Sequence, residues 1–230
     1  MLISLNNKNI GFKTIKMSLI TNEHIARFVQ EAHRAGDAKL MLCSSGNLSW
    51  RVGDEAIVSG TGSWLPKITA DRVSVCRIAD GIPVRDFKPS MASTFHLGIL
   101  RNRTDINVVL HFQSGFSTTI ACIEHKPSVF NVTAEVPCYV GREVPIVPYY
   151  RPGSPELAKA VTEAMKDHDC CLLSKHGQVV CGKDFDDAFQ KAMFFEMACG
   201  IIVRSGFKYT TLTDAEIEDL EIYVLGKKTK

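Results

Sequence analysis

Two histidines, His111 and His176, are the residues of this sequence best suited to chemistry. His111 ends the apolar run Val-Val-Leu-His (108–111), and His176 follows the apolar run Cys-Leu-Leu (171–173). Short apolar runs bounded by polar residues are typical of buried strands. An imidazole at the end of such a strand lies where the core meets the surface. Two such imidazoles can bind one divalent metal ion, of which zinc is the best match.

Gln113 is a candidate third ligand. Side chains two residues apart in a strand point to the same face, so Gln113 faces the same way as His111, and Phe112 faces the other way. An amide oxygen is neutral and a weaker ligand than an imidazole. The residues alone leave two interpretations of His111 and His176 open: metal ligands, or strand-end histidines that bond to backbone carbonyls.

Three short polar stretches have the composition of an anion-binding site. Glycine lets backbone N–H groups approach a ligand closely, and hydroxyl groups add further donors. A helix that starts after the third stretch would favour a negative group at its N-terminus. The stretches suit a phosphate or a carboxylate, although the same residues also dominate ordinary tight turns. They are Ser-Ser-Gly-Asn (44–47), Ser-Gly-Thr-Gly-Ser (59–63) and Lys-Pro-Ser (88–90).

The elements that would position these residues are a sheet and the helices that cover it. Gly53-Asp54 between two alternating segments predicts a hairpin, so the sheet is expected to be at least partly antiparallel. Helices are expected at about 21–35, 93–102, 117–124, 155–167, 185–204 and from 213 onward. Strands are expected at 47–52, 55–59, 73–78, 106–111, 143–148, 170–174 and 178–181.

Length and charge limit the classes of protein. The 230 residues, with 45% hydrophobic and 23% charged side chains, fit one domain with a real core. We expect a loosely ordered leader at 1–16 and a single domain at 17–230. The net charge of +2 is too small to indicate nucleic acid or a membrane surface as a partner. No apolar stretch reaches the length of a membrane span.

The cysteines predict buried thiols in a reducing cytoplasm. The chain has eight cysteines but no Cys-x-x-Cys pattern and no secretory signal. Seven of them lie in or beside apolar runs: Cys43, Cys122, Cys138, Cys170, Cys171, Cys181 and Cys199.

Taken in their order along the chain, the motifs of this sequence resemble those of the class II aldolase/adducin family over about residues 20 to 206. The matching stretches are Ser-Gly-Asn-Leu-Ser (45–49), Ser-Gly-Thr-Gly (59–62), Lys-Pro-Ser (88–90), Phe-His-Leu (95–97), Val-Val-Leu-His (108–111), Val-Pro-Tyr (147–149), Pro-Gly-Ser (152–154) and Lys-His-Gly (175–177). The resemblance implies an α/β fold, a three-layer α/β/α sandwich with a largely antiparallel central sheet. It also implies a homotetramer with active sites at subunit interfaces.

The resemblance assigns roles to individual residues. The family's zinc ligands correspond to His111, Gln113 and His176. Its contacts to the substrate phosphate correspond to Gly46, Asn47, Thr61, Gly62 and Ser90.

Two positions depart from the family pattern. Gln113 stands where the family has the second histidine of a His-x-His pair. Ala92 stands where the family has a glutamate that transfers protons, and alanine cannot do so. Replacement bases to consider are a metal-bound hydroxide and the side chains of Glu135, Tyr139 and Tyr149.

The function that the resemblance implies is a metal-dependent aldolase acting on a ketose 1-phosphate such as L-fuculose 1-phosphate. The metal would stabilise the charge that forms when the carbon–carbon bond breaks. Two alternatives stay open. One is a catalytically impaired module of the same fold that binds a sugar phosphate or only assembles. The other is a related epimerase or dehydratase.

Overall fold

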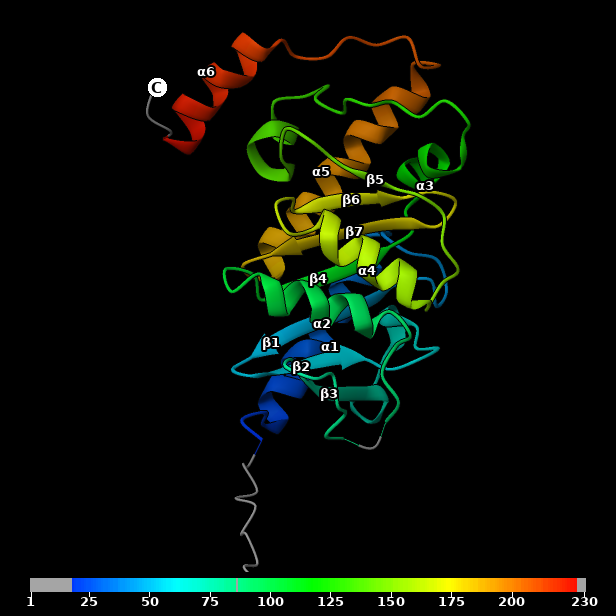
Figure 1. Cartoon of the computed structure of the whole chain (residues 1–230), viewed down its shortest axis with the longest axis vertical. Coiled ribbons are helices and arrows are strands. Elements are labelled where there is room, and N and C mark those ends of the chain that lie inside the picture. Colours follow the sequence, from blue (N-terminus) through cyan, green and yellow to red (C-terminus); the bar gives the residue numbers. More distant parts are fainter. Residues whose placement is uncertain (1–17, 86, 227–230) are drawn as a thin grey trace, which may run out of the picture.

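The chain folds into one seven-stranded sheet between two layers of helices (Figure 1). The computed structural model describes residues 18–85 and 87–226, so the expected leader at 1–16 lies outside the described residues. In Figure 1, α2 and α4 lie in front of the sheet, and α1 and α5 lie behind it. The expected three-layer α/β/α sandwich is therefore confirmed.

The sheet has the strand order β3-β2-β1-β4-β7-β6-β5. All neighbouring strands are antiparallel except β5 and β6, which are parallel, so the sheet is mixed but largely antiparallel. The strands are β1 (Asn47–Val52), β2 (Glu55–Ser59), β3 (Val73–Arg77), β4 (Val108–Phe112), β5 (Ile146–Val147), β6 (Cys170–Leu173) and β7 (Gly177–Gly182).

Most helices begin at the side chains that the sequence marks as caps. Thr21, Ser154, Asp184 and Thr213 each accept a backbone N–H from the first turn of the helix that follows. The helices are α1 (Asn22–Asp37), α2 (Ser93–Asn102), α3 (Gly115–Cys122), α4 (Pro155–Ala164), α5 (Phe185–Arg204) and α6 (Asp214–Leu225). The expected bounds of α2 and α5 are thus confirmed, whereas α4 ends three residues before the expected residue 167.

Three short helical turns were not expected from the sequence. They are η1 (Leu65–Lys67), η2 (Ala70–Arg72) and the π-helical η3 (Val136–Val140). Each is too short to show a hydrophobic period, and only tertiary packing defines it. The strand expected at 143–148 is likewise reduced to the two residues of β5, because its pairing with β6 covers only Ile146 and Val147.

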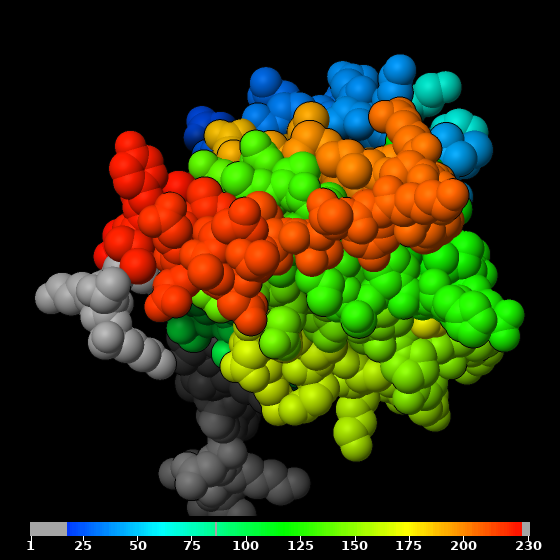
Figure 2. All heavy atoms as spheres, turned by 90° about the horizontal axis from the view of Figure 1, so that it is seen from above, coloured from blue at the N-terminus to red at the C-terminus, as the bar shows by residue number. Residues whose placement is uncertain are grey.

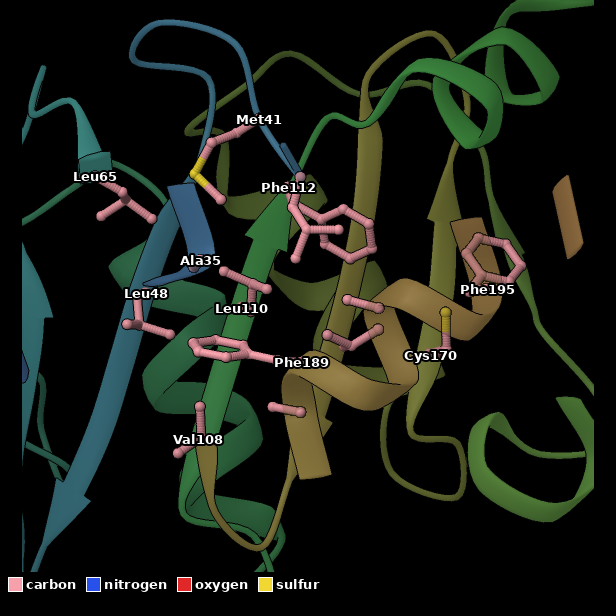
Figure 3. Packing of buried hydrophobic residues seen from close by; sticks show 14 of the residues in the cluster. Ala35, Met41, Leu48, Leu65, Val108, Leu110, Phe112, Cys170, Phe189 and Phe195 are labelled. Atoms are coloured by element: carbon pink, nitrogen blue, oxygen red, sulfur yellow. The ribbon is translucent and has the colours of Figure 1, made fainter. Parts of the chain in front are cut away.

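The alternation of side chains along β4 divides the core into two layers. Leu110 and Phe112 pack with α1, α3 and α5, whereas Val109 packs with α2 and α4. Figure 3 shows the first layer, where Phe112 and Leu110 lie among side chains from α1 and α5. Adjacent residues on β6 divide in the same way, since Cys170 belongs to the first layer and Cys171 to the second. Consecutive side chains of a strand point to opposite faces of the sheet, which accounts for this division.

The expectation that the cysteines are buried is wrong for two of them. Cys43 and Cys122 are exposed. Cys43 lies in the loop before β1 with a left-handed φ of 52°, and Cys122 ends α3. An apolar neighbourhood in sequence does not bury a residue that sits at the solvent side of a turn. All eight thiols are free of disulfide bonds.

Helix α6 lies outside the two helix layers, across one end of the molecule (Figures 1 and 2). It packs on η3, and its Glu221 forms an ion pair with Arg142 at 2.9 Å. No helix among the described residues is long and apolar enough to cross a membrane.

A carboxylate from another helix caps α3. The Glu196 side chain, on α5, accepts the backbone N–H groups of Phe116 at 2.8 Å and Ser117 at 2.9 Å. It also accepts the hydroxyl groups of Ser114 and Ser117, each at 2.7 Å. A negative group at a helix N-terminus is favourable because the first N–H groups there lack partners within the helix. This contact explains why α3 starts at Gly115, two residues before the expected start.

We predict that Glu196→Ala lowers the free energy of unfolding by roughly 2–3 kcal/mol, because it leaves buried donors without an acceptor. Urea unfolding followed by circular dichroism measures the change. Glu124→Ala is the matched control, since Glu124 is exposed just after α3, and a change within about 0.5 kcal/mol is expected there. Equal losses in both variants would contradict a specific cap.

Candidate active site

The two histidines meet at one edge of the sheet. Strands β4 and β6 run in the same direction, because both are antiparallel to β7. Their carboxyl ends therefore lie at the same edge, where His111 stands in β4 and His176 in the turn from β6 to β7. The centroids of the two rings are 4.8 Å apart. The structure brings together two residues that are 65 positions apart in the sequence.

His111 is held in one orientation by the neighbouring strand. Its Nδ1 lies 2.8 Å from the carbonyl oxygen of Gln178. A carbonyl can only accept, so Nδ1 carries the proton and Nε2 keeps a free lone pair. Burial, with a smaller effect of His176, lowers the pKa of His111 to about 3. The ring is thus neutral near pH 7 and offers Nε2 as a ligand atom. His111 can therefore bond to a backbone carbonyl through Nδ1 and still serve as a metal ligand through Nε2.

His176 has an unpartnered nitrogen. Its Nδ1 is buried and has no hydrogen-bond partner among the described residues. Burial also lowers the pKa of this imidazole, which favours the neutral form. A buried polar atom without a partner is costly and points to a missing ligand. The preceding Lys175 adopts a left-handed φ of 57°, which turns the chain back sharply toward β7.

Gly177 lets this turn approach β4 closely. A Cβ at this position would lie 2.6 Å from the Phe112 carbonyl oxygen, 2.8 Å from Gln113 Cγ and 3.2 Å from His111 Cε1. Any side chain would therefore force the turn away from the strand. Gln113 and His111 therefore both lie beside Gly177, the residue that follows His176, so the structure brings the three predicted metal-site residues close to one another.

These residues fit a divalent metal, but as a reduced ligand set. Two neutral imidazoles with available nitrogens match the ligands of zinc and related ions. Among residues 18–85 and 87–226, no group of three or more His, Cys, Asp and Glu side chains is suited to hold a metal ion. The amide of Gln113 would be the remaining protein ligand, and an amide oxygen is a weaker ligand than an imidazole.

The polar stretches converge beside the histidines. The N–H of Ser90 donates to the carbonyl of Ser59 at 3.0 Å. The N–H of Thr61 donates to the carbonyl of Lys88 at 3.0 Å. These two bonds join the second and third stretches. Gly62 has a φ of 66° with no neighbouring atom within 4 Å of a Cβ built on it, so the tip of this loop faces open space.

The first stretch joins this group through β1. Asn47, the first residue of β1, is directly opposite His111 on β4. The N–H of Leu48 donates to the Ser59 hydroxyl at 3.1 Å, which ties the start of β1 to the end of β2. All three polar stretches therefore lie at the edge of the sheet that carries the histidine pair.

The residue at the family's glutamate position offers only a methyl group. Ala92 precedes the first turn of α2, and its N–H donates to the Ser90 hydroxyl at 3.2 Å. The neighbouring Met91 is 63% exposed, and the backbone of Gly153 lies close to it. The segment 88–92, Lys-Pro-Ser-Met-Ala, contains no carboxylate side chain that could transfer a proton.

The three side chains considered as replacement bases have different surroundings. Glu135 precedes η3, which packs on α5 and α6. Burial raises the pKa of Cys138 in this turn, and the charges of Glu221 and Glu135 add to the effect. Tyr139 contacts Phe194 of α5, with ring centroids 5.3 Å apart. Tyr149 is 56% exposed. Glu135 and Tyr139 therefore lie at η3 and α5, away from the histidine pair. Tyr149 follows β5, whose Val147 carbonyl accepts the N–H of Ser174 at 2.9 Å, so it leaves the sheet at the edge that carries His176. The roles of all three side chains stay predictions.

Sequence reasoning missed a third histidine at this edge. His96 of α2 is fully buried, and its Nε2 lies 2.6 Å from Asn47 Oδ1. Its other ring nitrogen, Nδ1, lies 2.8 Å from the hydroxyl of Ser49. The available signal was the Phe-His-Leu motif, which places a polar ring within an otherwise apolar turn of the helix.

Sequence comparisons agree with this architecture. The family model described as Class II Aldolase and Adducin N-terminal domain matches residues 26–203. A 3-oxo-tetronate 4-phosphate decarboxylase from Escherichia coli O6:H1 is 35% identical over 213 residues, covering 91% of this chain and 98% of the relative. An L-fuculose phosphate aldolase from Methanocaldococcus jannaschii is 32% identical over 170 residues, covering 74% and 90%.

A solved structure supports the same conclusion. The crystal structure of YgbL from Escherichia coli superposes with a TM-score of 0.80 at 31% identity, covering 86% of this chain and 97% of that one. The match of the family model spans well over half of the sequence and includes both histidines, the polar loops and the seven strands. The chain belongs to the class II aldolase and adducin N-terminal domain family.

Proposed function

We propose that this chain is a metal-assisted carbon–carbon lyase that decarboxylates a phosphorylated 3-oxo sugar acid. The observation that carries the proposal is Ala92, a methyl group at the start of α2 where a proton-transferring side chain would be expected. The relative with 35% identity, named a 3-oxo-tetronate 4-phosphate decarboxylase, supports this choice of substrate class.

The chemistry explains why Ala92 favours this reaction. In aldol cleavage, a base must remove the proton of the hydroxyl group next to the breaking bond. In decarboxylation, the carboxylate is already ionised, and carbon dioxide leaves without loss of a proton. The electron pair of the broken bond moves toward the neighbouring carbonyl, and the carbon then takes a proton from water. Only the second reaction has a bond-breaking step that needs no base.

The protein residues would bind and orient the substrate. The polar groups of Gly46, Asn47, Thr61, Gly62 and Ser90 would hold the phosphate at the edge of the sheet. His111, His176 and Gln113 would hold a divalent metal, of which zinc is our choice. When bound, the metal would supply a Lewis acid for the carbonyl oxygen. Because the protein ligands are few, substrate oxygens would complete the coordination, and metal affinity without substrate is expected to be low.

Aldol cleavage of a ketose 1-phosphate such as L-fuculose 1-phosphate is the second candidate, favoured by the Methanocaldococcus jannaschii relative. It requires another base, such as Glu135, Tyr139, Tyr149 or a metal-bound hydroxide. An epimerase or dehydratase would need a base as well. A module that only binds sugar phosphate, or only assembles, would show neither turnover nor metal. We also propose a homotetramer, as in the family, and a reducing cytoplasm, which suits the free thiols.

The first test concerns metal. We predict that His111→Asn lowers zinc affinity, and that His176→Asn does so as well. Each loss should exceed the roughly 10–100-fold that follows when only a residue hydrogen-bonded to a metal ligand is changed. Gln113→His is expected to raise it, because an imidazole is a better ligand than an amide. Competition with a chromophoric chelator measures affinity. His125→Asn, at an exposed position, is the control. Zinc binding that is unaffected by both ligand variants would exclude this site.

The second test separates the two reactions. The native chain is expected to release carbon dioxide from 3-oxo-tetronate 4-phosphate and to leave L-fuculose 1-phosphate almost unchanged. Ala92→Glu should raise aldol cleavage by roughly two to four powers of ten, the usual contribution of a positioned acid or base. Met91→Glu places the same acid one residue away and should not. Fast native aldol cleavage without carbon dioxide release would overturn the decarboxylase proposal.

The third test uses pH. Burial lowers the pKa values of His96 and His111 to about 3, so the unfolded chain binds two more protons below pH 6.5. The contribution of these two histidines to the free energy of unfolding is therefore fully present above pH 6.5 and is lost as the pH falls toward 3. Between pH 6.5 and 5.0 the loss is roughly 1.5 kcal/mol per histidine.

Urea unfolding in the presence of a chelator, at both pH values, measures this loss. His111→Asn should remove about half of the contribution of the two histidines, whereas His125→Asn should remove none of it. A stability that does not change between the two pH values would mean that these rings are accessible to protons in the folded protein.

A further inference from the structure

A hydrogen-bonded chain of three side chains lies behind the anion loops. His96, on α2, stands between Ser49 in the middle of β1 and Asn47 at its start. The Ser49 hydroxyl lies 2.8 Å from His96 Nδ1, and Asn47 Oδ1 lies 2.6 Å from His96 Nε2. Ser49 and His96 are both fully buried, whereas Asn47 is only partly buried. The chain thus leads from the core to the edge of the sheet.

The order of donors along this chain follows from what each atom can do. A neutral imidazole has one donor and one acceptor nitrogen. Burial, together with the nearby His111, keeps the pKa of His96 at about 3, so the ring is neutral near pH 7. Among the described residues, the Ser49 hydroxyl has no partner other than His96. Its proton must therefore go to Nδ1, because a buried hydroxyl donor without an acceptor is costly.

The consequence reaches the Asn47 amide. If Ser49 donates to Nδ1, then Nε2 carries the ring proton and donates to Asn47 Oδ1. The amide oxygen is thereby engaged, and the NH2 group of Asn47 has no hydrogen-bond partner within the described residues. With the proton on Nδ1 of His96 instead, the Asn47 amide would be rotated. Its NH2 group would donate to Nε2, and its oxygen would face the edge of the sheet where the anion loops lie. An amide oxygen repels a phosphate, whereas an amide NH2 group donates to it.

We propose that His96 is a positioning residue, which with Ser49 fixes the Asn47 amide so that its NH2 group is available to the substrate phosphate. This inference rests on the proposed anion site, because an orientation of Asn47 matters only if an anion binds there. It assigns a role to a buried helix residue that does not itself contact the ligand. It also explains why a serine is buried in the middle of β1.

The experiment measures the affinity of the full chain for inorganic phosphate by calorimetry. Ser49→Ala should weaken binding roughly five- to tenfold, whereas Ser49→Thr, which keeps the hydroxyl, should preserve it. Asn47→Ala combined with Ser49→Ala should be no weaker than Asn47→Ala alone, because Ser49 acts through Asn47. Ser74→Ala removes a fully buried serine of β3 and is the control for a purely structural effect.

A second measurement does not depend on any variant. NMR spectra that resolve the ring nitrogens of the histidines in the native protein should show His96 as the neutral tautomer with its proton on Nε2. A proton on Nδ1 would overturn the inference, as would unchanged phosphate affinity in Ser49→Ala or additive losses in the double variant. If the native chain does not bind phosphate at all, the anion site of the proposed function fails, and this inference fails with it.

Discussion

The pairing of β4 on both sides is the constraint on which the candidate site depends. Strand β1 places Asn47 opposite His111, and β7 places the Gln178 carbonyl where the His111 ring can donate to it. The return from β6 to β7 then brings His176 beside His111, with Gly177 lying against the strand. A shift of β4 by one residue would turn His111 into the other core layer and separate all of these groups. The candidate metal ligands and the candidate anion-binding residues therefore depend on one strand register.

Burial gives the histidines at this edge different roles. Water is excluded from His96 and His111, and both rings remain neutral because the charged forms would lose their hydration. His96 uses both ring nitrogens within the protein, which excludes it as a ligand. His111 uses one, and His176 has a buried nitrogen for which the described part of the chain offers no partner. The number of hydrogen bonds that each ring makes within the protein thus distinguishes His96 from His111 and His176, which keep a nitrogen available to a metal.

Local signals in the sequence predicted most of this architecture. Capping residues such as Asp184 predict where a helix starts, and the alternation of side chains along a strand predicts that Phe112 faces away from His111. The start of α3 was missed because its cap, Glu196, comes from a helix about 80 residues later in the chain. The π-helical η3 and the short β5 depend on packing, which local sequence does not encode. Motif order placed His111 and His176 in one site, but the bonds of His96 required the spatial arrangement of α2 and β1.

The division of adjacent residues between two layers has a consequence for how opening of this protein could be followed. Cys170 lies in the layer of α1, α3 and α5, and Cys171 lies in the layer of α2 and α4. Burial raises the pKa of both thiols, so neither reacts while its layer is closed. The thiols of these two adjacent residues of β6 therefore report separately on the two sides of the sheet. The order in which an alkylating reagent reaches the two sulfur atoms distinguishes detachment of one helix layer from detachment of the other.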